Sequence, residues 1–451
     1  MKAEIDTLQR FVAKQRGLTF KNDVEVKVLG GAEFKTRVLK EFEAEESSMQ
    51  QQGELLKAVG LVPADLDVVK AQRGLLGDGV LGFYDPKTKA LVVRGDNIGP
   101  FFREIAVHEL THALDDQYFA LDRPDLTAKK DGSDWAFLGL AEGNARRVEY
   151  AYKDQLSAQD KQTLSEEQLK LGMDQMGSVM NTPMILPRIL MAPYDYGNPF
   201  VKALMTRKGN AGVDKAYANP PLSSEQILDE AKFESGEGPV AVDRPPAEGE
   251  IVSEGTLGEL MTGFMLNGGG GGLGLDGIGG SGGLDALGGM DEKTITDLIN
   301  KILGGEIDPS VLGGEPGGPG ALPGEAGGSN GTGLDAILGG NADGPGGQFG
   351  AVKTVKGWGG DHYVMYRSIG NGVCIRADWK MDTATDLANM EAALRTWSAT
   401  SKATIDKPTT DTVRMTRCSG VPAGGGSSGG GSGNSPASPP STTSTTRSRS
   451  R

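Results

Sequence analysis

The chain has 451 residues, with 60 acidic against 46 basic side chains and a formal net charge of −14 at pH 7. This excess of negative charge argues against nucleic acid as a partner, and no apolar run reaches the roughly 20 residues that a membrane-spanning helix needs. Hydrophobic residues make up 37% and there are 69 glycines, which predicts a folded body that carries disordered segments. The first residues lack the apolar core of a signal peptide, so no secretory signal is expected in this sequence.

The first hundred residues predict helices around a small sheet. The spacing of apolar residues predicts helices over 2–14 and 34–61, with a turn at Pro63. Residues 24–28 alternate apolar and charged side chains, as a half-buried strand does. Residues 79–84 and 90–94 predict two strands joined by a turn.

Residues 101–117 contain the pattern His-Glu-x-x-His, formed by His108, Glu109 and His112. Apolar residues flank the pattern without proline or glycine, which predicts a buried helix. Side chains four residues apart project from one side of a helix, so both imidazoles can bind one ion while Glu109 takes a proton from a water on it. Imidazole ligands favour zinc, which lowers the pKa of its water to about 7. Two of the 3 histidines in the chain lie in this pattern, so chance spacing on an amphipathic helix is the weaker alternative.

Residues 134–154 predict a second amphipathic helix, with Glu142 beside its apolar side. A half-buried carboxylate needs a cationic partner, and a metal ion is one. Because a catalytic zinc has three protein ligands, we predict Glu142 as the third; the alternative is an ion pair with Arg146 one turn later. Gly143 would let this helix approach another backbone closely.

Helical patterns continue to about residue 235, interrupted by prolines that include Pro193 and Pro199. Residues 236–249 are rich in turn-forming residues, and a short helix is predicted over 256–266. Residues 267–350 are rich in glycine and poor in aromatic residues, which predicts a disordered insert. Residues 271–278 resemble one repeat of a calcium β-roll, but that architecture needs several stacked copies, so no calcium site is predicted.

Ordered sequence resumes after residue 351. The patterns predict strands over 358–366, 373–379 and 412–416, and a helix over 382–398. Cys374 and Cys418 could form one disulfide between two of these strands, or remain free thiols. Residues 421–451 are mostly Gly, Ser, Thr and Pro, which predicts a disordered tail.

With these residues in view, the chain resembles bacterial zinc metallopeptidases of the gluzincin group, which have a thermolysin-like site. It resembles more closely a set of largely uncharacterised metallopeptidases from bacteria such as actinobacteria. The shared sequences are HELTHALDDQYFAL, LAEGNARRVEY, YGNPFV, PPLSSEQIL, TLGEL and GWGGDHYV. The resemblance implies an α+β, zincin-like and mainly helical catalytic domain, built from residues 1–266 and 351–420 on either side of the insert. It also implies an extracellular or cell-surface enzyme that acts on a peptide or protein.

By the same resemblance, His108, His112 and Glu142 are the ligands of a zinc ion (Zn²⁺) and Glu109 is the catalytic base. Relatives tend to have a histidine where this chain has Asp229. If that histidine assists catalysis in the relatives, its role is either empty in this chain or passes to another residue.

Two candidates could stabilise the developing oxyanion in that role. His362, the remaining histidine, is one, although a surface histidine after a Gly-Gly turn fits the sequence equally well; Tyr196 is the other. The metzincin pattern is excluded, because it would require glycine and histidine at the positions of Asp115 and Tyr118.

The sequence therefore predicts a zinc-dependent peptidase with Glu109 as general base. Two alternatives stay open: a surface or matrix-binding protein that retains a zincin scaffold without catalysis, and a zinc hydrolase of a non-peptide bond. A strand of the predicted hairpin could hold an extended substrate by main-chain hydrogen bonds, or be purely structural. The oligomeric state is not predicted.

Overall fold

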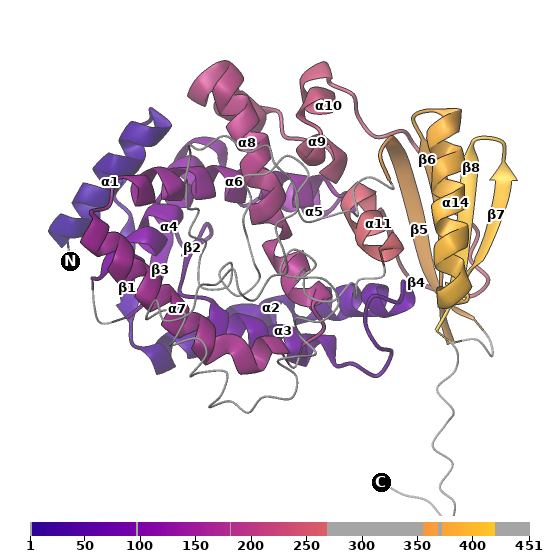
Figure 1. Ribbon diagram of the computed structural model, residues 1–451, viewed down its shortest axis with the longest axis horizontal. Helices are drawn as coiled ribbons and strands as arrows, with labels where there is room; N and C mark the ends of the chain where they lie inside the picture. Colours follow the sequence, from indigo (N-terminus) through magenta and orange to yellow (C-terminus); the bar gives the residue numbers. More distant parts are fainter. Residues whose placement is uncertain (1, 96–97, 181, 268–354, 369–371, 420–451) are drawn as a thin grey trace, which may run out of the picture.

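The structure is a computed structural model that describes residues 2–95, 98–180, 182–267, 355–368 and 372–419. The predicted insert from residue 268 onward, including the β-roll-like repeat, and the predicted tail lie outside the described residues. The described residues form a mixed α+β fold, which confirms the predicted class. A three-stranded and a five-stranded sheet lie at opposite ends of the molecule, with most of the helices between them (Figure 1).

The small sheet consists of β1 (Glu25–Leu29), β2 (Gly82–Asp85) and β3 (Ala90–Arg94) in the order β1-β3-β2. β1 runs parallel to β3, and β2 runs antiparallel to it. One face packs on α1 (Lys2–Arg16) and α4 (Pro100–Phe119), and the other packs on α2 (Gly31–Ala58).

The strands agree with the prediction except at residue 79. The predicted strand began there, whereas α3 (Val68–Gly79) continues to that residue and β2 begins at Gly82. The apolar residues of α3 pack with those of α2 in a shared core, so tertiary packing extends the helix.

Helix α4 carries the His-Glu-x-x-His pattern and is buried, as predicted. Pro100 opens it at a position where its missing N–H costs nothing. The carboxylate of Glu167 on α7 (Ala158–Met180) accepts a hydrogen bond from the Phe101 N–H at 3.1 Å. Val107, Leu110 and Leu114 have no exposed surface, so the hydrophobic effect holds the helix between the sheet, α1 and α6.

Helix α6 (Ser133–Asp154) crosses α8 (Ile185–Ala218) at two glycines. A Cβ on Gly143 would lie 2.2 Å from both the carbonyl carbon and the oxygen of Gly197, and a Cβ on Gly197 would lie 1.9 Å from the Gly139 oxygen. The prediction that Gly143 permits a close backbone approach is therefore confirmed.

The predicted interruption of the helical pattern at Pro193 and Pro199 is wrong. Both prolines lie inside α8, whose non-helical residue is Gly209, with a φ of 59° and a ψ of −158°. Packing against α6 maintains the helix despite the backbone hydrogen bonds that proline cannot donate. The remaining short helices of the described residues are α5 (Pro124–Thr127), α9 (Ser224–Leu228), α10 (Glu230–Ser235) and α11 (Gly258–Leu266).

The large sheet is entirely antiparallel, in the order β4-β5-β6-β8-β7. Its strands are β4 (Glu250–Gly255), β5 (Trp358–Ser368), β6 (Gly372–Met381), β7 (Thr404–Thr409) and β8 (Thr412–Cys418). β4 precedes the predicted insert and pairs with β5, which follows it. The two predicted sequence blocks thus share one sheet, while the domain boundaries themselves remain predictions.

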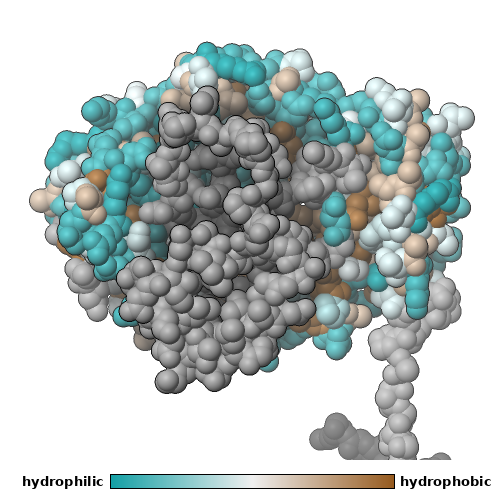
Figure 2. Space-filling model, viewed as in Figure 1, coloured by the Kyte–Doolittle hydropathy of each residue, from teal (hydrophilic) through white to brown (hydrophobic). Residues whose placement is uncertain are grey.

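One face of the large sheet packs on α11 and α14 (Ala384–Ser401) in the largest apolar core, which also contains residues of α2 and α3. In Figure 2, hydrophobic residues show between the helical body and this sheet. β4 and β7 were not predicted, because both strands are mostly polar and lie at the sheet edges. Cys374 and Cys418 lie opposite each other on β6 and β8 and form a disulfide, the first of the two predicted alternatives.

None of the helices in the described residues is long and apolar enough to cross a membrane.

The crossing of α6 and α8 gives a testable prediction. Gly143→Ala should lower the free energy of unfolding by on the order of 1–3 kcal/mol or more, because the new methyl group forces the two backbones apart. Gly74→Ala on α3 is the matched control: nothing lies within 4 Å of its Cβ position, so it should stabilise by about 0.5–1 kcal/mol. Urea unfolding measures both; equal effects would contradict the close contact.

Candidate metal centre

The three predicted metal ligands lie together where α4 faces α6. Oε2 of Glu142 lies 3.1 Å from Nε2 of His108 and 3.3 Å from Nε2 of His112. The two Nε2 atoms are 3.1 Å apart. One ligand atom from each residue lies within 4.8 Å of the others, so this group could hold a metal ion.

The donor set suits a zinc ion. Two imidazole nitrogens and one carboxylate oxygen are the ligands of many catalytic zinc sites. Atoms bound at about 2 Å to one tetrahedral ion lie roughly 3–3.5 Å apart, and the three separations lie in that range. Other divalent ions accept the same ligands, so the geometry supports a metal site without fixing the ion.

Neighbouring charges shift the pKa values of all three candidate ligands. Burial by itself would lower the pKa of His108, but hydrogen bonds to Glu142 and Glu149 raise it to about 10. The pKa of His112 is raised by the charge of Glu142, against the effect of burial. The same histidines hold the pKa of Glu142 well below its usual range, although burial opposes this shift. A metal ion at this site would therefore compete with protons for the two imidazoles.

A chain of buried charged side chains begins at Nδ1 of His108, the ring nitrogen that does not face Glu142. Oε2 of Glu149 lies 3.0 Å from Nδ1 of His108. The other Glu149 oxygen lies 3.4 Å from Nζ of Lys153, which also binds Glu104 at 3.0 Å. Gln168 donates to the second oxygen of Glu104 at 2.8 Å. A carboxylate on the far nitrogen of a metal-binding histidine fixes the tautomer and orients the ring.

Sequence reasoning missed Glu149. It lies seven residues after Glu142, which places the two side chains on the same side of α6. That spacing was the available signal, but a glutamate among charged residues at this end of the helix fits a solvated surface equally well.

Glu109 projects from α4 toward the edge of the small sheet. Its Oε2 accepts a hydrogen bond from the Tyr84 N–H of β2 at 2.7 Å. Burial raises its pKa, while the charges of His108 and His112 oppose that shift. The Tyr84 hydroxyl donates to Asp116 on α4 at 2.7 Å. Two hydrogen bonds, one from the backbone and one from the side chain of Tyr84, thus attach β2 to α4.

β2 is an edge strand, as a substrate-binding strand would have to be. Its Tyr84 N–H is bonded to Glu109 and not to another strand. A role for this hairpin in holding substrate remains a prediction.

Tyr194 is the tyrosine that lies beside the candidate metal ligands. Its ring centroid lies 5.8 Å from that of His108, and its hydroxyl is near enough to Glu142 for that carboxylate to raise its pKa. Burial and the charges of Glu142 and Glu109 raise its pKa well above the usual value, so it is a neutral hydrogen-bond donor. Tyr196, the residue proposed from the sequence, packs instead with the apolar cores of the helical body and the large sheet.

The different positions of Tyr194 and Tyr196 follow from the geometry of α8. Residues two apart on α8 point about 200° apart around the axis, so Tyr194 and Tyr196 cannot face the same site. The sequence offers both tyrosines in one short segment, and only the packing of α8 on α6 selects between them.

His362 is not brought to the metal-binding group. Along β5, Tyr363 and Met365 face the core shared with α11, while Val364 and Tyr366 face the opposite side of the sheet. His362 alternates with Tyr363 and therefore lies on that opposite side, where its Nδ1 is 3.3 Å from the Val242 oxygen. The suggestion that it stabilises an oxyanion has no support in this arrangement.

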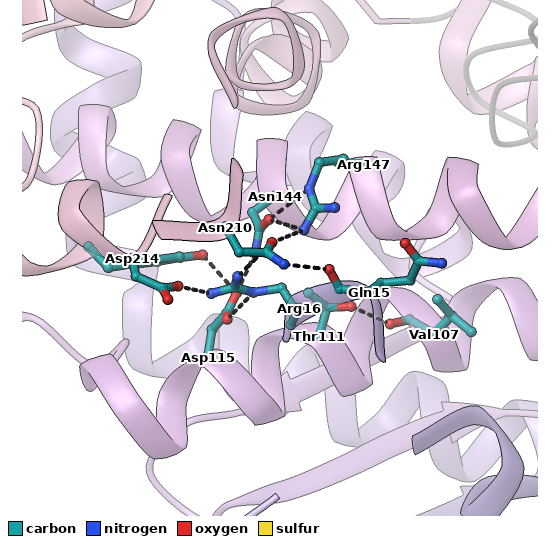
Figure 3. A network of polar contacts seen from close by, with 10 residues as sticks. Gln15, Arg16, Val107, Thr111, Asp115, Asn144, Arg147, Asn210 and Asp214 are labelled. Atoms are coloured by element: carbon teal, nitrogen blue, oxygen red, sulfur yellow. Dashed lines mark hydrogen bonds and ion pairs between the residues drawn. The ribbon is translucent and has the colours of Figure 1, made fainter. Parts of the chain in front are cut away.

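A buried polar network holds the helices around the site in place (Figure 3). Arg16 at the end of α1 binds Asp115 on α4 at 2.7 Å and Asp214 on α8 at 2.8 Å. The second oxygen of Asp115 accepts from Asn144 on α6 at 2.6 Å. Arg147, one turn on from Asn144, donates to its side-chain oxygen at 3.0 Å. The network thus joins four helices one turn beyond His112.

The exclusion of the metzincin pattern is consistent with these contacts. Asp115 is engaged with Arg16 and has no exposed surface. The hydroxyl of Tyr118 donates to the Thr19 carbonyl at 2.8 Å. Neither belongs to the group that could hold a metal ion.

Proton release should accompany metal binding. Because the pKa of His108 is raised to about 10 in the metal-free protein, an ion binding at pH 7 must displace about one proton or more. Titration calorimetry in two buffers of different ionisation enthalpy measures this number, and the affinity should rise with pH through the neutral range. Identical heats in both buffers would contradict the raised pKa.

Glu149→Gln should lower the metal affinity roughly 10- to 100-fold, because the neutral amide orients and polarises His108 less well. Asp154→Asn, which removes one exposed charge at the end of the same helix, is the matched control and should leave the affinity unchanged. Competition with a chelator of known affinity measures both. Equal affinities in the two variants would remove Glu149 from this role.

The sequence matches no protein-family model and no curated protein. One solved structure is similar, that of a protein from Chloroflexus aurantiacus described as "a putative hydrolase with a novel fold". The two chains are 17% identical, with a TM-score of 0.33, over 52% of this chain and 88% of the other. This similarity is too low to indicate a shared fold, so the chemistry of the site rests on its own residues.

Proposed function

We propose that this protein is a metal-dependent hydrolase, that its ion is zinc, and that it cleaves peptide bonds. The observation that carries the proposal is the convergence of His108, His112 and Glu142, with Glu109 one residue away on the same helix. The resemblance of these residues to the gluzincin site favours a peptide as substrate, and a zincin-like fold is part of the same proposal.

The chain's own residues divide the work of hydrolysis. When bound, zinc would supply a Lewis acid that lowers the pKa of a water to about 7 and polarises a carbonyl. Glu109 accepts the proton of the attacking water and delivers it to the leaving amine. Its raised pKa suits a group that must both accept and return a proton near neutral pH.

Three further groups hold this arrangement. The Tyr84 N–H fixes the Glu109 carboxylate, and Glu149 holds the ring of His108. Tyr194 presents a neutral hydroxyl beside Glu142, where it can donate a hydrogen bond to the oxygen on which negative charge develops. Tyr194 therefore takes the role for which the sequence had suggested His362 or Tyr196.

The disulfide between Cys374 and Cys418 supports a proposal about location. Disulfides persist in oxidising compartments and are rare in the cytosol. An extracellular or cell-surface enzyme would agree with both the disulfide and the resemblance.

The test is Glu109→Gln, which keeps the shape of the side chain and removes the base. Zinc content should stay at the wild-type level, while the rate on casein or a fluorogenic peptide library should fall by roughly 10²- to 10⁴-fold. Glu166→Gln, an exposed charge on α7, is the matched control and should be fully active. A Glu109→Gln protein that cleaves casein at the wild-type rate would falsify the proposal.

The same assay separates the alternatives. Zinc binding without hydrolysis of any peptide or ester would indicate a scaffold that has lost catalysis. Hydrolysis of esters or other acyl compounds, with peptides left intact, would indicate a zinc hydrolase of a non-peptide bond.

A further inference from the structure

A pocket of about 350 Å³ lies between the helical body and the large sheet, at the start of α6. Residues of α2, α11, β4 and β5 line it together with Trp135 of α6. None of the candidate metal ligands is among the residues that line this pocket. Its volume falls in the range of pockets that bind ligands.

The pocket has an apolar floor and a polar mouth. Leu260, Trp358 and Tyr363 are buried at its base. At the mouth lie polar residues of α2 and β4, among them Gln51 and Ser253. Such a site gains free energy by burying a large apolar group, while hydrogen-bonding groups at the rim suit the amides of a peptide backbone.

Helix α6 connects the pocket to the metal centre. Trp135, Glu142 and Glu149 follow one another at intervals of seven residues, so their side chains project from nearly the same side of the helix. Between the first two, Leu138 leaves 44% of its surface exposed, which is unusual for a large apolar side chain in this helix. One exposed apolar side chain, Leu138, therefore lies between Glu142 and the pocket residue Trp135 along α6.

The separation fits a peptide. The seven residues from Trp135 to Glu142 rise about 10 Å along the helix, and an extended peptide advances about 3.3 Å per residue. β4, which lines the pocket with Ser253 and Gly255, is an edge strand of the large sheet. Edge strands are common partners for extended peptides.

We propose that this pocket is a substrate subsite that takes one large apolar or aromatic side chain of an extended peptide, about three residues from the bond cleaved at the metal centre. This inference rests on the proposed peptidase function and adds the substrate class: peptides with a bulky apolar residue at that distance. The intervening residues would pass Leu138, whose exposed side chain lies between Trp135 and Glu142 on α6.

The test uses zinc-loaded Glu109→Gln protein, in which turnover does not obscure binding. The probes are dye-labelled dodecapeptides of Ala, Gly and Ser that carry either one Phe or one Ala at a scanned position, and fluorescence anisotropy measures their affinity. At one position the Phe peptide should bind on the order of tenfold more tightly than the Ala peptide.

Filling the mouth should remove this preference. Gln51→Trp places a large side chain at the pocket from an exposed position of α2, whereas Gln50→Trp makes the same change next to it, at an exposed residue that does not line the pocket. The Phe preference should be lost in the first variant and kept in the second. Thermal melts of both variants confirm that each is folded.

The outcomes separate this inference from the proposed function. If wild-type protein cleaves no peptide, the proposed function fails, but the binding comparison still decides whether the pocket takes an apolar side chain. Equal binding of Phe and Ala peptides at every position, or a Phe preference that survives Gln51→Trp, overturns the subsite. In the active enzyme, a Phe preference directly beside the cleaved bond overturns the spacing.

Discussion

The candidate metal centre depends on how closely α6 can approach its neighbours. Glu142 reaches His108 at 3.1 Å because α6 lies against α4 on one side and crosses α8 on the other. Gly143, the residue after Glu142, meets the backbone of Gly197 without any side chain between them. The hydrogen bond from Asn144 to Asp115 fixes the same stretch of α6 to α4 at 2.6 Å. Three consecutive residues thus supply a ligand, a close contact and a polar anchor.

Buried charge is the second constraint. The helices bring Glu104, Glu109, Glu142 and Glu149 into one region, where the cationic partners include Lys153, Arg146 and the two histidines. Uncompensated charge in a protein interior is costly, and the pKa of His108 rises accordingly. A divalent ion held by His108, His112 and Glu142 would neutralise the charge of Glu142 directly. The pair of Arg16 and Asp115, with no exposed surface on either side chain, is balanced by contrast within the protein itself.

The large sheet contributes to the site only at a distance. His362, the catalytic candidate on this sheet, lies on the face turned away from α11. The same strand, β5, places Trp358 and Tyr363 at the pocket beside the start of α6. β4 is joined to β5 by backbone hydrogen bonds, so residues on both sides of the predicted insert form one wall of that pocket. The arrangement gives the sheet a role in substrate recognition, as proposed above, and leaves the chemistry to the helices.

The sequence by itself determined the elements whose signal is local. The spacing of His108 and His112 requires only a helix to place both imidazoles on one side, and the apolar pattern of residues 101–117 predicted that helix. Glu142 followed from ligand counting and resemblance, and Gly143 from its missing side chain. The strands near Cys374 and Cys418 were likewise visible in their alternation, within a few residues.

Only the tertiary structure decided which residues from distant parts of the sequence lie beside the candidate metal ligands. Tyr194 instead of Tyr196, Glu149 behind His108, and the outward face of His362 all depend on how one element is rotated against another. Local sequence does not encode that rotation, because a helix or strand of the same pattern can pack at several angles. The edge strands β4 and β7 exist through pairing with neighbours and not through propensity, and Pro193 remains in a helix because α6 supports it.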